Sequence, residues 1–515
     1  MVNGRREFLA CCAVLLLAGC VLTGAAWLRS AEYDEQYTIF LTSGVPRPAW
    51  PDGPFQAGLA TVIAAGHASP GEIAHDLRTT DVHPPLYFWA VSLWRVMAGD
   101  GLFVARLLSV GFSLGALAAV GVIARKSGLP PALAMMLTLG CYGFAYTGCI
   151  ARGFALAQML SLAGVACGIT ARGWRQGALT GALLGAAVLA NYLAAFVAVT
   201  VILMLGLCRC KIQPPEQERP RPEPGRSRPI ITAAAALMGF LPFLLLAFWF
   251  FLAQRASRTG QFPPFESWPA LVRLAQYGAA NLAGGLPLYA PPSARPFAVA
   301  ALTAGTAALI GLLAVRWRYV ATPDGRLLLA ASALAPPAGL LALGFAFNNT
   351  PIELRYLSFA TPFVALLLAG AIQSVSSGRS VTALVLTIQA GSIAGLMFGT
   401  ETMQPARATA IAAAALVGNG AVLVPFGNDG VGIVGAFASE APAALPLLVI
   451  PATDTDAVIR ARANGLSRVA LALLAQDDAG RATIATMRSA FTHPDWRADG
   501  YGFNVITYQR ISAAE

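Results

Sequence analysis

Residues 8–28 read FLACCAVLLLAGCVLTGAAWL, an apolar stretch without a charged side chain. A helix of about 20 such residues crosses the ~30 Å hydrocarbon layer of a membrane. The run Ala31-Glu32-Tyr33-Asp34-Glu35-Gln36-Tyr37 follows, so Asp34 and Glu35 lie roughly two helical turns beyond the predicted span. We therefore expect this pair of carboxylates at the membrane surface. The alternative is that Asp34 is a solvated residue near the start of a helix.

The composition of the whole chain extends this pattern. Of its 515 residues, 57% are hydrophobic and 12% are charged, and the mean hydropathy is +0.63. These values exclude a soluble enzyme and indicate an α-helical polytopic membrane protein. Apolar runs between polar breaks predict eleven membrane spans, near residues 8–28, 102–124, 130–148, 153–171, 177–190, 192–208, 230–253, 296–315, 326–346, 356–375 and 381–399.

Basic residues predict the orientation of these spans, because Lys and Arg near span ends resist translocation. With the N-terminus inside, the inner segments carry sixteen basic residues, including both lysines of the chain, against ten in the longer outer connections. Eleven crossings then leave the C-terminal tail outside. We expect a multi-pass protein of the bacterial inner membrane whose active site faces the periplasm. The net charge of +10 follows from this orientation and from contact with membrane lipids, and it requires no nucleic-acid partner.

Three segments depart from the simple pattern of spans. Residues 84–98 are too few for a span and include Arg95, so we expect an interfacial helix on the outer surface. Residues 211–229 are rich in Pro, Glu and Arg and predict a disordered connector. At the N-terminus, Arg5-Arg6 and the run Leu17-Ala18-Gly19-Cys20 leave open an export signal or a lipoprotein cleavage site, which would remove the first span.

The composition becomes that of a soluble domain after residue 400. Predicted strands alternate there with predicted helices, the strands at 421–424, 447–450, 469–474 and 504–508 and the helices at 430–440, 454–463 and 479–490. We therefore expect a transmembrane domain over residues 1–399, with an outer loop at 29–101, and a periplasmic α/β domain over 400–515. This second domain is expected to act as a lid or a recognition surface and to perform no chemistry itself.

Three arginines lie at the outer ends of predicted spans: Arg106, Arg152 and Arg355. A guanidinium group forms bidentate contacts with phosphate oxygens and could stabilise the charge that develops on a phosphate leaving group. The alternative is that these side chains anchor helices at the interface. No Asp, Glu, Lys or His lies in the middle of a predicted span, whereas ion-coupled transporters usually need one.

Four further motifs carry a family resemblance. They are Asp81-Val82-His83-Pro84-Pro85-Leu86-Tyr87-Phe88, Ala105-Arg106-Leu107-Leu108-Ser109, Ala151-Arg152, and Arg355-Tyr356-Leu357 before Thr361-Pro362. In this order, and together with the acidic pair, they make residues 8–375 resemble the integral-membrane glycosyltransferases with the GT-C fold. The most similar branch is the superfamily of protein O-mannosyltransferases and lipid A aminoarabinose transferases.

The resemblance implies roles for individual residues. Asp34, with Glu35 beside it, corresponds to the catalytic base or acceptor-orienting group, and a carboxylate there could take the proton that an attacking hydroxyl loses. Substrate binding is implied for His83, Arg106, Arg152, Arg355 and Tyr356. The donor would be a sugar on a polyprenyl phosphate, and the acceptor an envelope glycolipid, polysaccharide or protein. Transfer of a single sugar would proceed with inversion.

One departure from the family concerns metal. Many relatives have Gln-Glu-Ala-Arg-Met-Tyr where this chain has Cys149-Ile150-Ala151-Arg152-Gly153-Phe154, so the second acid is missing. We therefore expect no divalent metal and no other cofactor. His67, His75 and His83 are eight residues apart, a spacing that does not force them together around zinc. The alternative function is a flippase for a lipid or a lipid-linked sugar, which would not need the carboxylate.

Overall fold

The computed structural model describes residues 2–171, 173–207, 228–255, 262–399, 405–475 and 478–511. All but the last two residues of the predicted connector at 211–229 lie outside these ranges. The chain divides into two units, and each is described by itself. Unit 1 comprises Met1–Trp27, Ala74–Tyr87 and Arg106–Phe398; unit 2 comprises Leu28–Ile73, Phe88–Ala105 and Gly399–Glu515.

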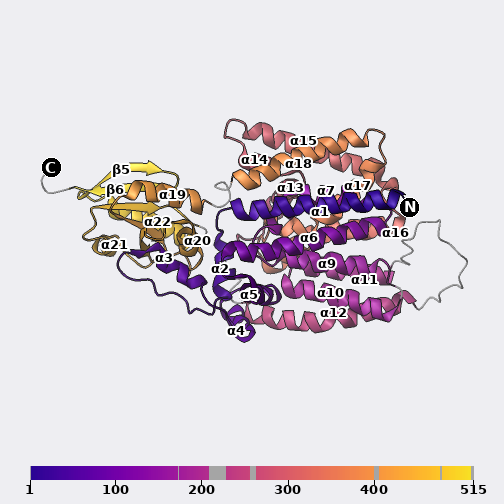
Figure 1. Cartoon of the computed structure of the whole chain (residues 1–515), viewed down its shortest axis with the longest axis horizontal. Helices are drawn as coiled ribbons and strands as arrows, with labels where there is room; N and C mark the ends of the chain where they lie inside the picture. Colours follow the sequence, from indigo (N-terminus) through magenta and orange to yellow (C-terminus); the bar gives the residue numbers. More distant parts are fainter. Residues whose placement is uncertain are drawn as a thin grey trace, which may run out of the picture. The chain divides into compact units, whose positions relative to one another are not determined.

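Unit 1 is helical, and a helix is present at each of the eleven predicted spans (Figure 1). Its helices are α1 (Val2–Leu28), α6 (Leu102–Lys126), α7 (Pro131–Gly140), α8 (Tyr142–Gly148), α9 (Phe154–Gly168), α10 (Trp174–Ala190), α11 (Ala194–Leu207), α12 (Arg228–Ala253), α13 (Ser267–Ala283), α14 (Leu286–Tyr289), α15 (Arg295–Arg316), α16 (Pro323–Phe347), α17 (Thr361–Gln373) and α18 (Gly378–Phe398). Among the described residues, six helices are long and apolar enough to cross a membrane: α1, α6, α12, α15, α16 and α18. The prediction of a polytopic helical membrane protein is confirmed.

Small residues let helices of unit 1 approach closely. Helix α10 lies between α9 and α12 (Figure 1). Gly177 and Gly181 of α10 face α12 so closely that a Cβ atom on either would collide with a backbone carbonyl of that helix. Glycines four residues apart are the usual device for close packing of helices in lipid, where the hydrophobic effect gives helices no reason to associate.

Two predicted spans are interrupted in the structure. The span expected at 130–148 breaks at Cys141, whose extended backbone separates α7 from α8. Beside the break, the buried Gln389 of α18 donates to the carbonyl of Leu137 at 3.3 Å and to that of Leu282 in α13 at 3.1 Å. The span expected at 356–375 begins as the 3-10 helix η5 (Leu354–Phe359) before α17. This irregular segment carries Arg355 and Tyr356.

Unit 2 contains a six-stranded sheet with the strand order β1-β3-β2-β4-β6-β5. The strands are β1 (Phe55–Gln56), β2 (Ala421–Pro425), β3 (Pro446–Ile450), β4 (Arg468–Ala472), β5 (Trp496–Gly502) and β6 (Val505–Arg510). Strands β3, β2 and β4 are parallel, and the others pair antiparallel. Buried side chains of α19 (Ala406–Val417) and α20 (Gly432–Glu440) form a core with the sheet, and a second core involves α21 (Asp456–Arg462) and α22 (Asp478–Phe491). The sheet is thus covered on both faces, as parallel strands require.

Unit 2 also includes segments that the sequence analysis assigned to the outer loop. Residues 28–73 and 88–105 belong to it, and strand β1 pairs with β3 through Phe55 opposite Leu447. A two-residue strand has no recognisable local pattern, because it forms only by pairing with a distant strand. The outer loop further contains α2 (Tyr33–Leu41), α3 (Ala57–Ala60), the 3-10 helix η1 (Thr61–Ala64), α4 (Pro70–Thr80) and α5 (Leu86–Ala98). Strand β5 and helix α19 were not predicted.

Candidate active site

Helix α2 carries the predicted acidic pair, and Asp34 and Glu35 have different environments in it. Glu32 is the N-cap, and its side chain accepts a hydrogen bond from the backbone N–H of Glu35. In return, Oε2 of Glu35 accepts from the backbone N–H of Glu32 at 3.1 Å, which completes a capping box. Glu35 is fully buried, whereas Asp34 is only half-buried. Glu35 therefore holds the start of the helix, and Asp34 is the acid of the pair that reaches the surface of unit 2.

The chain just before α2 is fixed by ion pairs within unit 2. Arg29 pairs with Glu32, and both side chains are buried. Arg407 of α19 donates to the carbonyl of Leu28 at 2.7 Å and pairs with Glu440 at 2.7 Å. Glu440 also accepts a hydrogen bond from the backbone N–H of Ala31 at 2.6 Å. Contacts from two helices of the α/β domain thus define the path of the segment that leads to Asp34.

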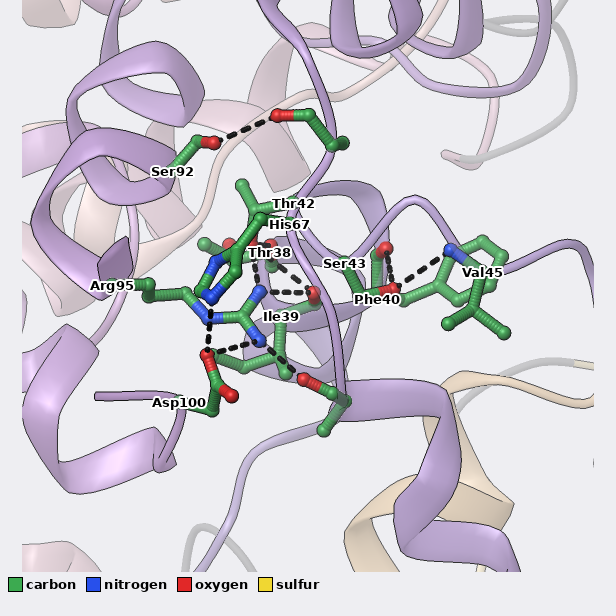
Figure 2. Close-up of polar contacts among 12 residues, drawn as sticks. Thr38, Ile39, Phe40, Thr42, Ser43, Val45, His67, Ser92, Arg95 and Asp100 are labelled. Carbon is green, nitrogen blue, oxygen red and sulfur yellow. Dashed lines mark hydrogen bonds and ion pairs between the residues drawn. The ribbon is translucent and has the colours of Figure 1, made fainter.

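The C-terminal end of α2 is fixed by Arg95 of α5, as Figure 2 shows. This guanidinium group is almost fully buried and donates to the carbonyl of Ile39 at 3.1 Å and to Oγ1 of Thr42 at 2.7 Å. It also donates to the carbonyl of Ala64 and lies 3.4 Å from Asp100. Burial lowers the pKa of Arg95, and the charge of Asp100 opposes this effect. The charged residue of the predicted interfacial helix is therefore an internal anchor of α2 within unit 2.

In unit 1, His83 and Arg152 are in direct contact. The loop between α4 and α5 carries Asp81 and His83, and Nδ1 of His83 lies 2.6 Å from Oδ1 of Asp81. The Arg152 guanidinium group lies 2.8 Å from Nε2 of the same ring. The same guanidinium nitrogen also lies 3.2 Å from Nδ1, so it contacts both nitrogens of the ring. The ring of His83 is thereby held between a carboxylate and a buried guanidinium.

The electrostatics of Asp81 agree with this arrangement. Burial by itself would raise the pKa of the Asp81 carboxyl, but the neighbouring His83 and Arg152 outweigh it and lower the pKa to about 2. Asp81 therefore stays ionised at all physiological pH values. The ionised carboxylate beside His83 restrains the orientation of the ring.

Gln254 at the end of α12 holds the loop that contains His83. Its Nε2 donates to the carbonyl of Leu77 and to that of His83, each at 2.8 Å, and its Oε1 accepts from the hydroxyl of Tyr192 at 2.9 Å. The side chain of Gln254 is fully buried. A buried amide that satisfies two carbonyls and one hydroxyl is a rigid contact, so the position of His83 depends on α12 as well as on its own loop.

The segments around Arg152 and Arg355 lie side by side. The ring of Phe154 stacks on that of Tyr356, with centroids 6.3 Å apart and an interplanar angle of 24°. Nε of Arg355 pairs with Glu353 at 2.6 Å, and the side chain of Arg355 keeps 21% of its surface exposed. Arg152 by contrast is buried, with 4% exposed. One arginine is therefore partly accessible and the other is buried.

Arg106 makes a different contact in unit 1. It is buried and donates to the carbonyl of Ala26 at the end of α1, at 2.8 Å. One turn further along α6, Ser109 bonds to the hydroxyl of Tyr87 at 2.8 Å. The bond to Ala26 agrees with the anchoring alternative for this residue, because it connects α6 to α1.

The predicted site residues are therefore distributed over both units. Asp34 and Glu35 belong to unit 2, and His83, Arg106, Arg152, Arg355 and Tyr356 belong to unit 1. Unit 1 brings His83 and Arg152 into contact and places Arg355 and Tyr356 on the adjoining segment. Within the described ranges, no group of three or more His, Cys, Asp or Glu side chains is arranged to hold a metal ion.

The sequence analysis gave no role to Asp81, Gln254, Tyr192, Arg95 or Arg407. Asp81 had a visible signal, because it stands two residues before His83 in the quoted motif. Gln254 contacts Tyr192, 62 residues away along the chain, and Arg407 contacts Leu28, 379 residues away. No local pattern predicts contacts of that kind.

The fold of the chain is similar to the folds of several solved structures. The chain is similar to ArnT from Cupriavidus metallidurans in the apo state, with a TM-score of 0.50 and 12% sequence identity over 97% of this chain and 98% of that one. A second structure of ArnT, bound to undecaprenyl phosphate, gives a TM-score of 0.48 and 14% identity over the same shares. The oligosaccharyltransferase of Archaeoglobus fulgidus in its apo form gives a TM-score of 0.45 and 10% identity over 89% of this chain and 69% of that one.

No model of a known protein family matches the chain, and no curated protein matches it. The similarity to apo ArnT extends over nearly the full length of both chains. It confirms the GT-C-like fold that the motifs of the sequence led us to expect.

Proposed function

We propose that this chain, which has the fold of the GT-C glycosyltransferases, transfers a single sugar from a polyprenyl phosphate to an acceptor in the cell envelope. The observation that carries the proposal is the environment of Asp34. Its carboxylate is only half-buried at the start of α2, a helix fixed at one end by a capping box and at the other by Arg95. A rigidly placed acid directly after the first span is what a general base for an acceptor hydroxyl requires.

The reaction would be a single displacement. The acceptor oxygen forms a bond to the anomeric carbon, the bond from that carbon to the donor phosphate oxygen breaks, and the acceptor proton passes to Asp34. The polyprenyl phosphate leaves with the bonding electrons. We assign the base to Asp34 and a supporting role to Glu35, because the carboxylate of Glu35 is buried in the capping box.

Arg152 and Arg355 are assigned to the donor phosphate. Guanidinium groups stabilise the charge that grows on a leaving phosphate. Arg355 is exposed enough to meet a ligand, and His83 with Asp81 orients Arg152. ArnT, which has this fold, binds undecaprenyl phosphate, and we propose a donor lipid of the same class. Tyr356 would line the same region through its stacking on Phe154.

Location and domain roles belong to the same proposal. We place the protein in the bacterial inner membrane, with Asp34 and residues 400–515 on the periplasmic side, because the distribution of Lys and Arg favours this orientation. Nucleotide sugars are absent from that side, which is why a lipid-linked donor is needed. The α/β domain would recognise the acceptor.

The test combines genetics with reconstitution. Mass spectrometry of envelope glycolipids, polysaccharides and glycoproteins from a deletion strain should show the loss of one sugar residue, which plasmid-borne wild-type protein restores. Purified protein in liposomes should then restore that sugar on envelopes of the deletion strain when lipid extract from wild-type cells supplies the donor. If the protein instead moves lipid-linked sugar across the liposome membrane and forms no product, it is a flippase and the proposal is wrong.

A further inference from the structure

Unit 2 contains a pocket of about 250 Å³ at the carboxyl edge of its parallel strands. Residues directly after β4, Leu474 and Ala475, form one side of it, and Ile433 and Ala436 of α20 form another. Tyr33 and Asn504 complete the lining on which the argument depends. All of these residues belong to unit 2.

The position of the pocket in the sheet is the first argument. Strands β2 and β4 are adjacent and parallel, and the helices that follow them, α20 and α22, contribute to the cores on opposite sides of the sheet. Where the helices after two adjacent parallel strands lie on opposite faces of the sheet, a crevice forms beyond the carboxyl ends of the strands. Open α/β sheets bind their ligands in such crevices. The pocket lies there, since it is lined by residues that follow β4 and by α20, which follows β2.

The second argument is the chemistry of the lining. Among the described residues that line the pocket there is no Asp, Glu, Lys, Arg or His. It offers the ring of Tyr33, and Gly432 packs so closely on that ring that a Cβ atom there would collide with it. It also offers the carboxamide of Asn504, for which no hydrogen bond is found among the described residues. The positive φ of Asn504, 52°, is explained by the two-residue turn between β5 and β6 and is not itself a sign of a site.

The volume and the location limit the occupant. Pockets for drug-sized ligands are roughly 300–1,000 Å³, so this one suits a single small ring. A neutral lining with one aromatic side chain and one amide matches a neutral sugar, which presents C–H groups to a ring and hydroxyl groups to an amide. Tyr33, which lines the pocket, directly precedes Asp34 in α2. A sugar held in the pocket would therefore lie beside the start of α2, the helix that carries the proposed base.

We propose that this pocket binds a neutral monosaccharide unit of the acceptor, so that the acceptor is a glycan and not an unglycosylated protein. This assignment of the acceptor rests on the proposed glycosyltransferase function, whereas sugar binding itself does not require a donor. The pocket would place an acceptor hydroxyl on the sugar, or on its neighbour in the glycan, near Asp34. Specificity for the acceptor would then be set by unit 2.

The test measures sugar binding without donor. The full chain in lipid nanodiscs, which avoid sugar-based detergents, is titrated with the methyl glycosides of mannose, glucose and galactose and, separately, with hexan-1-ol and methyl glucuronoside, and saturation-transfer NMR detects binding. Ala475→Leu fills the pocket from the loop after β4. Ala452→Leu makes the same change on the exposed loop after β3 and is the matched control. Asn504→Gly removes the amide and keeps the backbone conformation.

We expect at least one neutral glycoside to bind the wild type and the Ala452→Leu control equally. Ala475→Leu should abolish that binding, and Asn504→Gly should weaken it about fivefold to tenfold. The pocket proposal is wrong if no neutral glycoside binds, if Ala475→Leu leaves binding unchanged, or if only hexan-1-ol or the charged glucuronoside occupies the pocket. Normal transfer to envelopes by Ala475→Leu would also overturn it. Sugar binding without any transfer would instead contradict the glycosyltransferase function and leave the pocket intact.

Discussion

The two units of this protein are specified in different ways. Most of unit 1 is one continuous stretch, residues 106–398, whose helices follow the local hydropathy of the chain. Unit 2 is assembled from three separate stretches. Strand β1 joins the C-terminal sheet, and α2 packs against α20, only through long-range contacts. In a membrane every backbone group must be satisfied within its own helix, so local sequence is enough to define a span. A mixed sheet requires distant strands to find one another.

The charged groups of the two units differ as well. In unit 1, Asp81, His83 and Arg152 form one connected group at the ends of helices. In unit 2, the buried ions Arg29, Glu32 and Glu35 surround the start of α2 and leave Asp34 partly exposed. We infer that unit 1 supplies the donor site and unit 2 the base and acceptor site. Variants in the two units should therefore produce different defects.

The largest effect is expected in unit 2, from Asp34→Asn. The amide keeps the size of the side chain but cannot accept the acceptor proton, so the transfer rate should fall about 10²–10⁴-fold. Binding of undecaprenyl phosphate should remain that of the wild type. Glu35→Gln is the comparison, because it weakens the capping box and should lower thermal stability more than it lowers the rate. Near-normal turnover by Asp34→Asn would remove Asp34 as the base.

A large loss of stability is expected from Arg95→Met in the same unit. The change removes the donors that the carbonyl of Ile39 and the hydroxyl of Thr42 now use, and it should cost about 2–4 kcal/mol of unfolding free energy. Denaturant unfolding of the purified protein gives the value. Arg497→Met, at an exposed position of β5, is the control. Equal stability of the two variants would mean that Arg95 does not anchor α2.

Unit 1 should respond to Arg152→Ala with a defect in donor binding. Loss of charge-assisted hydrogen bonds to phosphate should weaken binding of undecaprenyl phosphate about 10-fold to 100-fold, while affinity for the phosphate-free alcohol stays the same. Arg152→Lys keeps the charge and should recover part of the affinity. If Arg152→Ala weakens phosphate and alcohol equally, the residue is a structural anchor and the contrast between the units is lost.

The smallest effect concerns the pH dependence of stability in unit 1. The pKa of Asp81 is lowered from 3.8 to about 2, so its carboxylate stabilises the folded state above pH 3.8, and this contribution disappears as the pH falls through 2. Asp81→Asn should cost about 1–2 kcal/mol at pH 6 and should flatten the pH dependence between pH 4 and 2. Denaturant unfolding curves at pH 6, 4 and 2 measure the free energy of unfolding of the variant and the wild type. Glu266→Gln, an exposed change in the same unit, should leave the curve of the wild type unchanged.

The sequence by itself determined the positions of the predicted spans and of four of the strands. Each of the eleven spans, from 8–28 to 381–399, falls on a helix, because hydrophobicity over some 20 residues is a local property. The apolar runs at 421–424 and 447–450 are central strands, since parallel strands buried on both faces have no polar alternation. The motifs around His83 and Arg152 could also be recognised in the sequence, because the residues of each motif are contiguous in the chain.

Only the tertiary structure decided which residues share an environment. It separated Asp34 from Glu35 by burying one of two adjacent carboxylates, and it turned Arg95 from a surface charge into the anchor of α2. It also brought Tyr33 to a pocket with Asn504, 471 positions later in the sequence. The physical reason is that burial and hydrogen bonding depend on what packs against a residue. A sequence specifies those partners only through the complete fold.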